Sequence, residues 1–268
     1  MTYDKIIVLD TDFIFKMYNI RKDDTESLMD KIMNLQFDIC CCHSRIVEEI
    51  RKNTNKGATT WLEDKIKNGK ILEFSDRWIL EKLNEELHNS TIIFYVRMLE
   101  VALNSIKDGT FKEIYTQTNK LDFNNVSLDI FLKAMEEDEK KHQVDFDLGE
   151  IKTLLLIQVL QFKYKAEITL FCSDDSKARN GVCSIPDVKC ISVLSSFIRL
   201  FKEKIIDRED AIPYMTSYID FLSQFNQSKF KIQDSSKRNI RVDCSLVLEG
   251  IFNDEFYELK NGMLRYKK

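Results

Sequence analysis

The chain has 268 residues, of which 44% are hydrophobic and 31% charged, and this length suffices for a sizeable core without disulfide or metal support. Only 7 glycines and 2 prolines are present, which excludes collagen-like and low-complexity chains and favours helices over a turn-rich all-β fold. The formal net charge of −4 speaks against a protein that binds nucleic acid mainly through a basic surface.

Short apolar runs predict five strands, and the segments between them carry apolar residues at helical spacing. The predicted strands are residues 5–9, 37–42, 70–74, 166–172 and 187–193. The predicted helices in this part of the chain are residues 25–34, 44–52, 148–163 and 195–204. Because strands alternate with helices, the sequence predicts a three-layer α/β fold with a central parallel sheet.

Two segments depart from this alternation. Residues 76–144 show helical patterns and no strand, so we interpret them as a helical insertion in an α/β domain made of residues 1–75 and 145–200. The helices predicted in the insertion are residues 77–87, 92–107, 111–116 and 128–141. Residues 201–268 are expected to form a helical C-terminal extension, with a helix over 211–225 and a polar, basic run over 227–242.

The sequence carries no sign of a membrane segment or of a disulfide framework. No apolar run reaches the roughly 18 residues that a transmembrane helix needs, and the first ten residues predict a strand rather than a signal peptide. The seven cysteines contain no Cys-x-x-Cys pair, so we interpret them as small buried side chains rather than as a zinc site. We therefore expect a cytoplasmic protein that does not contact a membrane.

Acidic residues follow two of the predicted strands, lie within the helix predicted over 44–52 and open the helix predicted over 148–163. They are Asp10, Asp12, Glu48, Glu49, Asp147, Glu150, Asp174 and Asp175. Ligands of open parallel sheets bind beyond the carboxyl ends of the strands, so we expect these carboxylates to converge there. On the helical wheel of residues 44–52, Glu49 flanks the buried stripe and Glu48 points to solvent, so we prefer Glu49. Close carboxylates repel one another unless a cation lies among them, and oxygen ligands suit Mg²⁺ or Mn²⁺, as one ion or two.

The chain resembles the PIN domain family of metal-dependent nucleases in four short motifs. They are IIVLDTDFIF at residues 6–15, SRIVEEI at 44–50, DLGEIKTLLL at 147–156 and LFCSDDSKAR at 170–179. By position, the resemblance assigns catalytic and metal-ligating roles to Asp10, Glu49, Glu150 and either Asp174 or Asp175. The long spacing between Glu49 and Glu150 and the C-terminal extension depart from the small members of the family, and they leave the substrate open.

Further residues near these motifs are candidates for supporting roles. Asp12 stands where many members of the family carry Asn, and it and Asp147 are additional candidate metal ligands. Ser173 stands where the family often has a hydroxyl residue beside the metal. The candidates for binding substrate phosphates are Arg45, Lys177 and Arg179, together with the basic run over 227–242.

The resemblance implies an endoribonuclease that hydrolyses phosphodiester bonds with a water activated by Mg²⁺ or Mn²⁺. Single-stranded RNA is the expected partner, in a toxin-like or defence role. A protein regulator bound by the insertion and a homodimer are further expectations. One alternative is a catalytically silent PIN-like scaffold that binds RNA or protein. Another is a phosphatase of the haloacid dehalogenase type, which also has an Asp-x-Asp after its first strand, as residues 10–12 do; the chain lacks the Lys spacing that such an enzyme needs.

Overall fold

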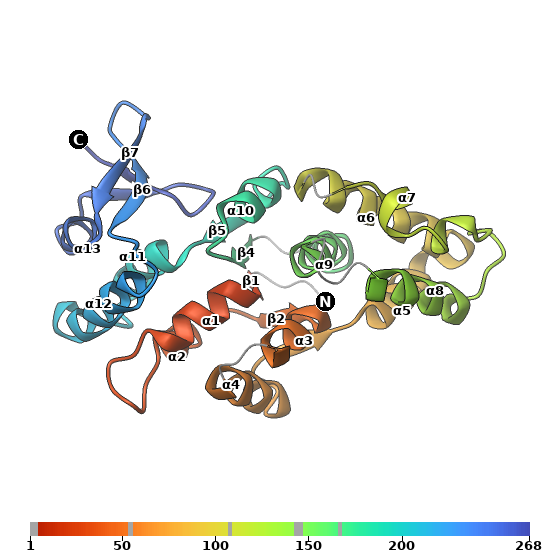
Figure 1. The fold of residues 1–268 in the computed structure, drawn as a ribbon, viewed down its shortest axis with the longest axis horizontal. Helices are drawn as coiled ribbons and strands as arrows, with labels where there is room; N and C mark the ends of the chain where they lie inside the picture. Colours follow the sequence, from red (N-terminus) through yellow and green to blue (C-terminus); the bar gives the residue numbers. More distant parts are fainter. Residues whose placement is uncertain (1–4, 53–55, 107–108, 142–146, 166–167) are drawn as a thin grey trace.

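Five parallel strands form the central sheet, in the order β3-β2-β1-β4-β5 (Figure 1). The computed structural model describes residues 5–52, 56–106, 109–141, 147–165 and 168–268. The strands are β1 (Lys5–Leu9), β2 (Ile39–His43), β3 (Leu72–Phe74), β4 (Ile168–Cys172) and β5 (Val188–Ile191). All five predicted strands are therefore present, although residues 166–167, predicted to begin the fourth, lie outside the described part of the chain.

Side chains alternate between the two faces of the sheet, and helices cover both faces. In β1, Ile7 and Leu9 pack into one hydrophobic core, while Ile6 and Val8 pack into the other. The helices on the Ile7 face are α1 (Thr11–Asn19), α2 (Leu28–Ile32), α3 (Ser44–Lys52), α4 (Lys56–Lys67) and α11 (Val193–Lys202). The three-layer α/β fold predicted from the sequence is thus confirmed.

The other face of the sheet is covered by α9 (Leu148–Tyr164), which lies between the sheet and the predicted insertion (Figure 1). Its residues are buried on nearly every side, which explains why this helix is apolar all round. The insertion consists of α5 (Asp76–Leu87), η1 (His88–Ser90), α6 (Thr91–Ile106), α7 (Phe111–Ile114), η2 (Thr118–Lys120) and α8 (Leu128–Lys141). The short helix α10 (Ser176–Val182) adds to the same core. Lys107, the last residue of one predicted helix, lies outside the described residues.

The expectation of a helical C-terminal extension is wrong for most of its length. After α12 (Arg208–Ser223), the chain forms a second sheet in the order β7-β6-β9-β8, interrupted by one helix. Its elements are β6 (Lys229–Gln233), β7 (Asn239–Asp243), α13 (Cys244–Phe252), β8 (Phe256–Glu258) and β9 (Leu264–Tyr266). The basic run forms the β6–β7 hairpin, because Phe230 and Ile232 alternate with exposed lysines and bury one face.

The C-terminal sheet is attached to the open edge of the central one. The backbone N–H of Cys190 in β5 donates to the carbonyl of Lys260 (2.7 Å), and the Ser192 hydroxyl donates to the carbonyl of Gly262 (2.8 Å). These bonds satisfy backbone groups at a sheet edge that would otherwise be exposed. Within the described residues, no helix combines the length and apolar character needed to cross a bilayer.

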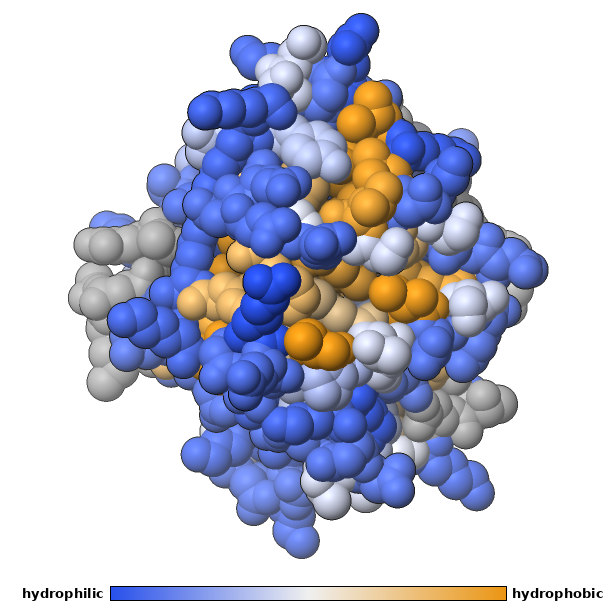
Figure 2. Space-filling view, turned by 90° about the vertical axis from the view of Figure 1, so that its left-hand side faces the viewer, coloured by the Kyte–Doolittle hydropathy of each residue, from blue (hydrophilic) through white to orange (hydrophobic). Residues whose placement is uncertain are grey.

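Hydrophobic side chains also reach the surface on the side of the molecule that carries α12. They lie among hydrophilic neighbours, as Figure 2 shows for this side. Ile212 on α12 and Phe225 just beyond it are 51% and 63% exposed. Isolated exposed apolar residues are common on protein surfaces, so we assign no role to them.

Candidate metal centre

The carboxyl ends of β1 and β4 are neighbours, and hydrogen bonds join the residues that follow them. The backbone N–H of Asp10 donates to the carbonyl of Cys172 (3.0 Å), and the N–H of Asp174 donates to Asp12 Oδ1 (3.1 Å). The two acidic pairs that the sequence placed after separate strands are thus adjacent at one edge of the sheet, where open α/β folds bind their ligands.

Asp10 is the most deeply buried of these carboxylates. It begins helix α1, and its Oδ1 accepts the backbone N–H of Thr11 (2.8 Å). Burial, and then the nearby charges of Asp12 and Glu49, raise the pKa of Asp10 well above its usual range, although the Ser173 hydroxyl opposes this shift. A cation bound nearby would favour the charged form of this carboxylate and so oppose the shift.

Glu49 comes from α3 and turns toward the start of α1. The Thr11 hydroxyl donates to Glu49 Oε2 (2.7 Å), whereas Glu48 remains half exposed and pairs with Arg45 (3.1 Å). The Glu49 carboxylate also lies directly against Gly149, in the first turn of α9. Of the two adjacent glutamates, Glu49 is therefore the one that reaches the acidic edge.

Glu150 lies in the first turn of α9, and its Oε2 atom is buried without a hydrogen-bond partner. Burial raises its pKa to about 9, and the negative charges of Asp10 and Asp175 add to this effect. Buried polar atoms in proteins nearly always have partners, so an orphaned carboxylate oxygen facing other carboxylates requires an explanation. A bound cation would provide the missing partner.

Sequence reasoning missed Lys16, which occupies one end of the acidic edge. Its ammonium group lies 2.7 Å from Asp174 Oδ2 and 3.5 Å from Asp12 Oδ2. Asp174 also accepts the backbone N–H of Val193 through Oδ1 (3.2 Å), so both of its oxygens have partners. The four-residue spacing of Asp12 and Lys16 on α1 was a signal that could have predicted this ion pair.

Asp175, the second acid after β4, acts electrostatically on Glu150. It begins helix α10, and its Oδ1 accepts the backbone N–H groups of Lys177 (2.6 Å) and Ala178 (2.8 Å). Its charge contributes to raising the pKa of Glu150. Between the two residues that the family resemblance left open, this placement favours Asp175, because Asp174 is already paired.

The other predicted candidates lie around this edge with differing partners. The Ser173 hydroxyl accepts the N–H of Asp175 (3.1 Å), and Asp147 lies 3.5 Å from the ammonium group of Lys177, which is half exposed. Arg179 is buried and donates to the carbonyls of Ser173 (2.8 Å) and Asn261 (2.9 Å). Its guanidinium therefore supports the loop after β4, which leaves Lys177 as the more exposed cation at this end.

Across the described parts of the chain, no three His, Cys, Asp or Glu side chains are arranged so that they could hold a metal ion. Several of these acids already have other partners, since Lys16 pairs with Asp174 and helix-capping bonds engage Asp10 and Asp175. The donor set consists of oxygens alone and includes an orphaned one on Glu150, so it fits a hard cation such as Mg²⁺ or Mn²⁺. Binding one would require the side chains to turn inward.

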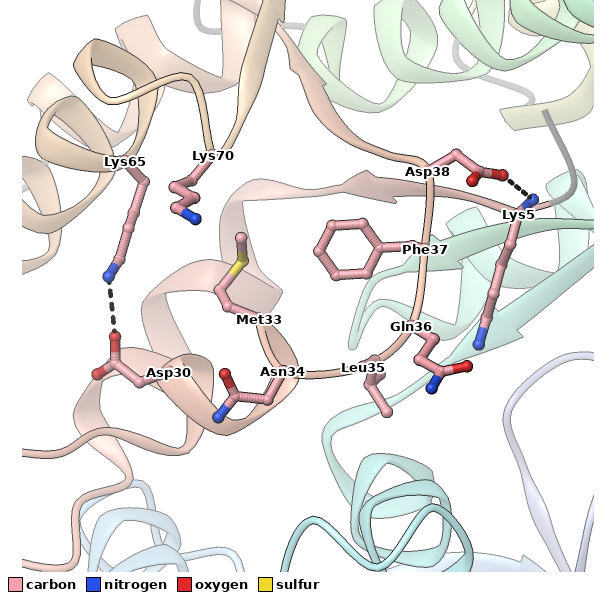
Figure 3. A pocket seen from close by; sticks show the side chains of 10 residues that line it. All are labelled: Lys5, Asp30, Met33, Asn34, Leu35, Gln36, Phe37, Asp38, Lys65 and Lys70. Carbon is pink, nitrogen blue, oxygen red and sulfur yellow. Dashed lines mark hydrogen bonds and ion pairs between the residues drawn. The ribbon is translucent and has the colours of Figure 1, made fainter. Parts of the chain in front are cut away.

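A separate cavity lies at the opposite end of the sheet. It has a volume of about 810 Å³ and lies beside the starts of β1 and β2 (Figure 3). Figure 3 shows Lys65 reaching Asp30 across one side, at 3.4 Å, and Asp38 accepting the backbone N–H of Lys5 on the other, at 3.0 Å. Because parallel sheets bind ligands at their carboxyl ends, this cavity is not the candidate site.

No family model, curated protein or solved structure matches the chain. The assignment of a function therefore rests on the motifs and on the geometry of the acidic edge.

Proposed function

We propose that this protein is a divalent-metal-dependent endonuclease of the PIN type that cleaves single-stranded RNA. The observation that carries the proposal is the buried, unpartnered Oε2 of Glu150, a side chain on which the negative charges of Asp10 and Asp175 act where β1 and β4 end. Glu49 supplies a fourth carboxylate from α3. All seven cysteines are free thiols, which supports a reducing, cytoplasmic location as part of the proposal.

The position of each residue at this edge would determine its role in binding and catalysis. Asp10, Glu150 and Asp175 would hold the ion, with Glu49 beside them, and a bound Mg²⁺ or Mn²⁺ supplies an activated water and stabilises the leaving oxygen. Ser173 holds the Asp10 side chain through its hydroxyl group. The exposed ammonium group of Lys177 lies beside this edge and would bind a phosphate of the strand.

The decisive experiment is cleavage of labelled single-stranded RNA with Mn²⁺, Mg²⁺ or EDTA, by the wild-type protein and by Asp10→Asn. We expect Mn²⁺-dependent cleavage that the substitution abolishes, with an unchanged circular dichroism spectrum. Single- and double-stranded DNA of the same sequence serve as competing substrates. An unchanged cleavage rate in Asp10→Asn would show that these carboxylates do not take part in catalysis.

A catalytically silent scaffold is the second candidate, and one observation favours it. Lys16 already neutralises Asp174 and Asp12, as a cation built into the site could do in place of a metal. Titration calorimetry with Mn²⁺ separates the two proposals, because a silent scaffold should release no binding heat at this edge. We favour the nuclease because the ion pairs of Lys16 are with Asp174 and Asp12, so this residue leaves the orphaned oxygen of Glu150 unexplained.

A further inference from the structure

Two cysteines on neighbouring elements bring their sulfur atoms into contact. Cys183 caps the end of helix α10, and Cys190 lies in β5, the edge strand against which this helix packs (Figure 1). Their Sγ atoms are 3.5 Å apart. The sulfurs of a disulfide are about 2.0 Å apart, so these two must approach each other by roughly 1.5 Å to form one.

Both cysteines are also tied to one backbone atom. The carbonyl oxygen of Arg179 accepts the backbone N–H of Cys183 (3.0 Å) and lies 3.4 Å from Cys190 Sγ, whose S–H can donate to it. The contact between the sulfurs is therefore fixed by hydrogen bonds to a shared acceptor as well as by the packing of α10 on β5.

Lys260, in the turn between β8 and β9, binds the same two residues. Its carbonyl accepts the backbone N–H of Cys190 (2.7 Å), and its ammonium group donates to the carbonyls of Cys183 (2.9 Å) and Ile185 (3.1 Å). One residue of the C-terminal region thus holds both cysteines and places a positive charge near Cys183.

The two thiols differ in accessibility and in acidity. Cys190 is fully buried, whereas Cys183 is partly exposed. A hydrogen bond with Cys190 lowers the pKa of the Cys183 thiol, and the charges of Lys260 and Arg179 act in the same direction, against partial burial. The same hydrogen bond, together with burial, raises the pKa of Cys190. Partly exposed thiols close to cations are the ones that react, so Cys183 is the nucleophile of the pair.

The other five cysteines provide a contrast within the chain. They are Cys40, Cys41, Cys42, Cys172 and Cys244, and all are buried. Burial raises the pKa of each of these thiols. Thiols in such surroundings are inert and serve as small apolar side chains. All seven cysteines lie in the described residues, and Cys183 is the one among them that is not buried.

We infer that Cys183 and Cys190 are a redox-responsive pair, which forms an intramolecular disulfide by exchange with a small-molecule disulfide such as oxidised glutathione. Disulfides of this reversible kind are the ones found in reducing compartments. The inference is independent of the proposed nuclease activity, because it requires neither a metal nor a nucleic acid.

The exchange proceeds in two steps. The Cys183 thiolate first attacks one sulfur of the small disulfide, which forms a mixed disulfide and releases a thiolate that takes up the proton lost by Cys183. Cys190 then loses its proton and attacks Cys183 Sγ, and the second small thiolate leaves and takes up that proton. Two protein thiols are thereby oxidised to one disulfide, and one small disulfide is reduced to two thiols.

The test follows the thiols of the whole protein. Reduced protein is equilibrated in mixtures of reduced and oxidised glutathione, free thiols are blocked with N-ethylmaleimide, and intact mass and peptide maps identify the products. We expect a bridge between Cys183 and Cys190, two fewer blocked thiols than in the reduced protein, and full reversal by dithiothreitol. The absence of a bridge at every ratio, a bridge that forms only in urea, or one between other cysteines overturns the inference.

Single variants separate the two steps. Cys190→Ser retains a donor for the Arg179 carbonyl but removes the second sulfur, so a mixed disulfide with glutathione should accumulate on Cys183. Cys183→Ser should form neither a bridge nor an adduct. Thermal unfolding shows whether each variant is folded, and Cys190→Ala replaces Cys190→Ser if the buried hydroxyl prevents folding. Cys244→Ala, which removes a buried thiol elsewhere, is the control and should behave like the wild-type protein.

The roles of the two thiols can also be overturned. An adduct on Cys190 in Cys183→Ser that is as abundant as the adduct on Cys183 in Cys190→Ser would contradict the attack by Cys183.

Lys260 provides a kinetic test of the same assignment. Lys260→Gln removes the cation near Cys183 and should slow the first reaction with dithionitrobenzoate, a chromogenic disulfide, roughly two- to fivefold. Lys267→Gln is the matched control, because Lys267 lies just beyond β9 and pairs with Asp254 instead. Equal rates in the two variants would show that Lys260 does not activate Cys183.

Discussion

The carboxylate of Glu49 lies so close to Gly149 that a Cβ atom at position 149 would be 2.5 Å from both of its oxygens. No side chain other than hydrogen can occupy that space without displacing Glu49. Gly149 therefore allows the first turn of α9 to approach α3, and it is followed directly by Glu150. The Gly-Glu pair brings acidic residues from two distant segments of the chain to one edge.

Gly149→Ala should weaken metal binding without unfolding the protein. Alanine favours the helix over glycine by about 1 kcal/mol, which offsets part of the steric cost. Displacing Glu49 should lower Mn²⁺ affinity roughly 10- to 100-fold, as is typical when residues that position metal ligands are altered. Titration calorimetry measures this change. In a Glu49→Ala background the extra Cβ meets no carboxylate, so adding Gly149→Ala should then have little effect; a further large loss would contradict the steric explanation.

Glu150 should make metal binding release protons. With a pKa of about 9, the carboxyl group is protonated at pH 7, and a bound cation would displace that proton. Calorimetry at pH 7 in buffers of different ionisation enthalpy should show that at least about one proton is released per Mn²⁺ bound. The affinity for Mn²⁺ should rise between pH 6 and pH 9. Glu150→Gln should abolish the release attributable to this group. If proton release is unchanged in Glu150→Gln, the proton must come from a group other than Glu150.

The same carboxyl group should make stability depend on pH in the absence of metal. Its folded-state pKa is raised above the ordinary value of 4.5, so its favourable contribution is fully present below about pH 4.5 and is lost as the pH rises toward 9. Wild-type protein in EDTA should therefore lose stability over this range more steeply than Glu150→Gln. Urea unfolding at pH 5, 7 and 9 compares them, and parallel pH profiles would show that Glu150 is not buried as described.

Lys16 should compete with a metal for the acidic edge. Lys16→Gln removes the ammonium group beside Asp174 and Asp12, so the carboxylates repel one another more strongly when no metal is added. We expect a lower melting temperature in EDTA but a larger stabilisation by Mn²⁺ than in the wild-type protein, measured by thermal unfolding. Lys22→Gln, which breaks the exposed pair with Asp210, is the control. An equal response to Mn²⁺ in both variants would exclude competition by Lys16.

Much of the fold was predictable because its signals are local. The five apolar strands and the helix over 44–52 are set by short-range patterns, and the structure contains them all. Helix α1 was missed because Asp10 alone separates it from β1, so the sequence gives no loop that would mark a new element. The β6–β7 hairpin was missed because its exposed lysines concealed the alternation of Phe230 and Ile232.

The site was predictable as a set of residues but not as a set of contacts. The position of each acid relative to a strand end or helix start indicated that they would meet. Sequence could not show that Lys16 would neutralise Asp174, or that Arg179 would donate to the carbonyl of Asn261, because those contacts join elements far apart in the chain. The unpartnered Oε2 of Glu150 is likewise a product of tertiary packing.

Lys152 should be the residue whose removal most weakens the attachment of the insertion. It is 1% exposed and lies between Asp76 of α5 and Glu139 of α8, where Tyr115 also donates to Glu139 (2.8 Å). Lys152→Met leaves two buried carboxylates without their cation, a change that costs about 3–5 kcal/mol. Chemical unfolding measures the loss. Lys163→Met, on the same helix but in a surface pair, should cause only a small change.

The pH dependence of that loss distinguishes electrostatics from packing. Burial alone would raise the pKa of Asp76, but Lys152 and His43 outweigh it and lower the pKa, so in the wild-type protein this group stabilises above about pH 3.8 and the benefit is lost in acid. In Lys152→Met, only His43 and the Tyr95 hydroxyl would still oppose the effect of burial, so the pKa of Asp76 should rise and the carboxyl group should become costly as the pH increases. The difference in unfolding free energy between variant and wild type should therefore be larger at pH 8 than at pH 5. A difference that is equal at both values would mean that Lys152 acts through its volume and not through its charge.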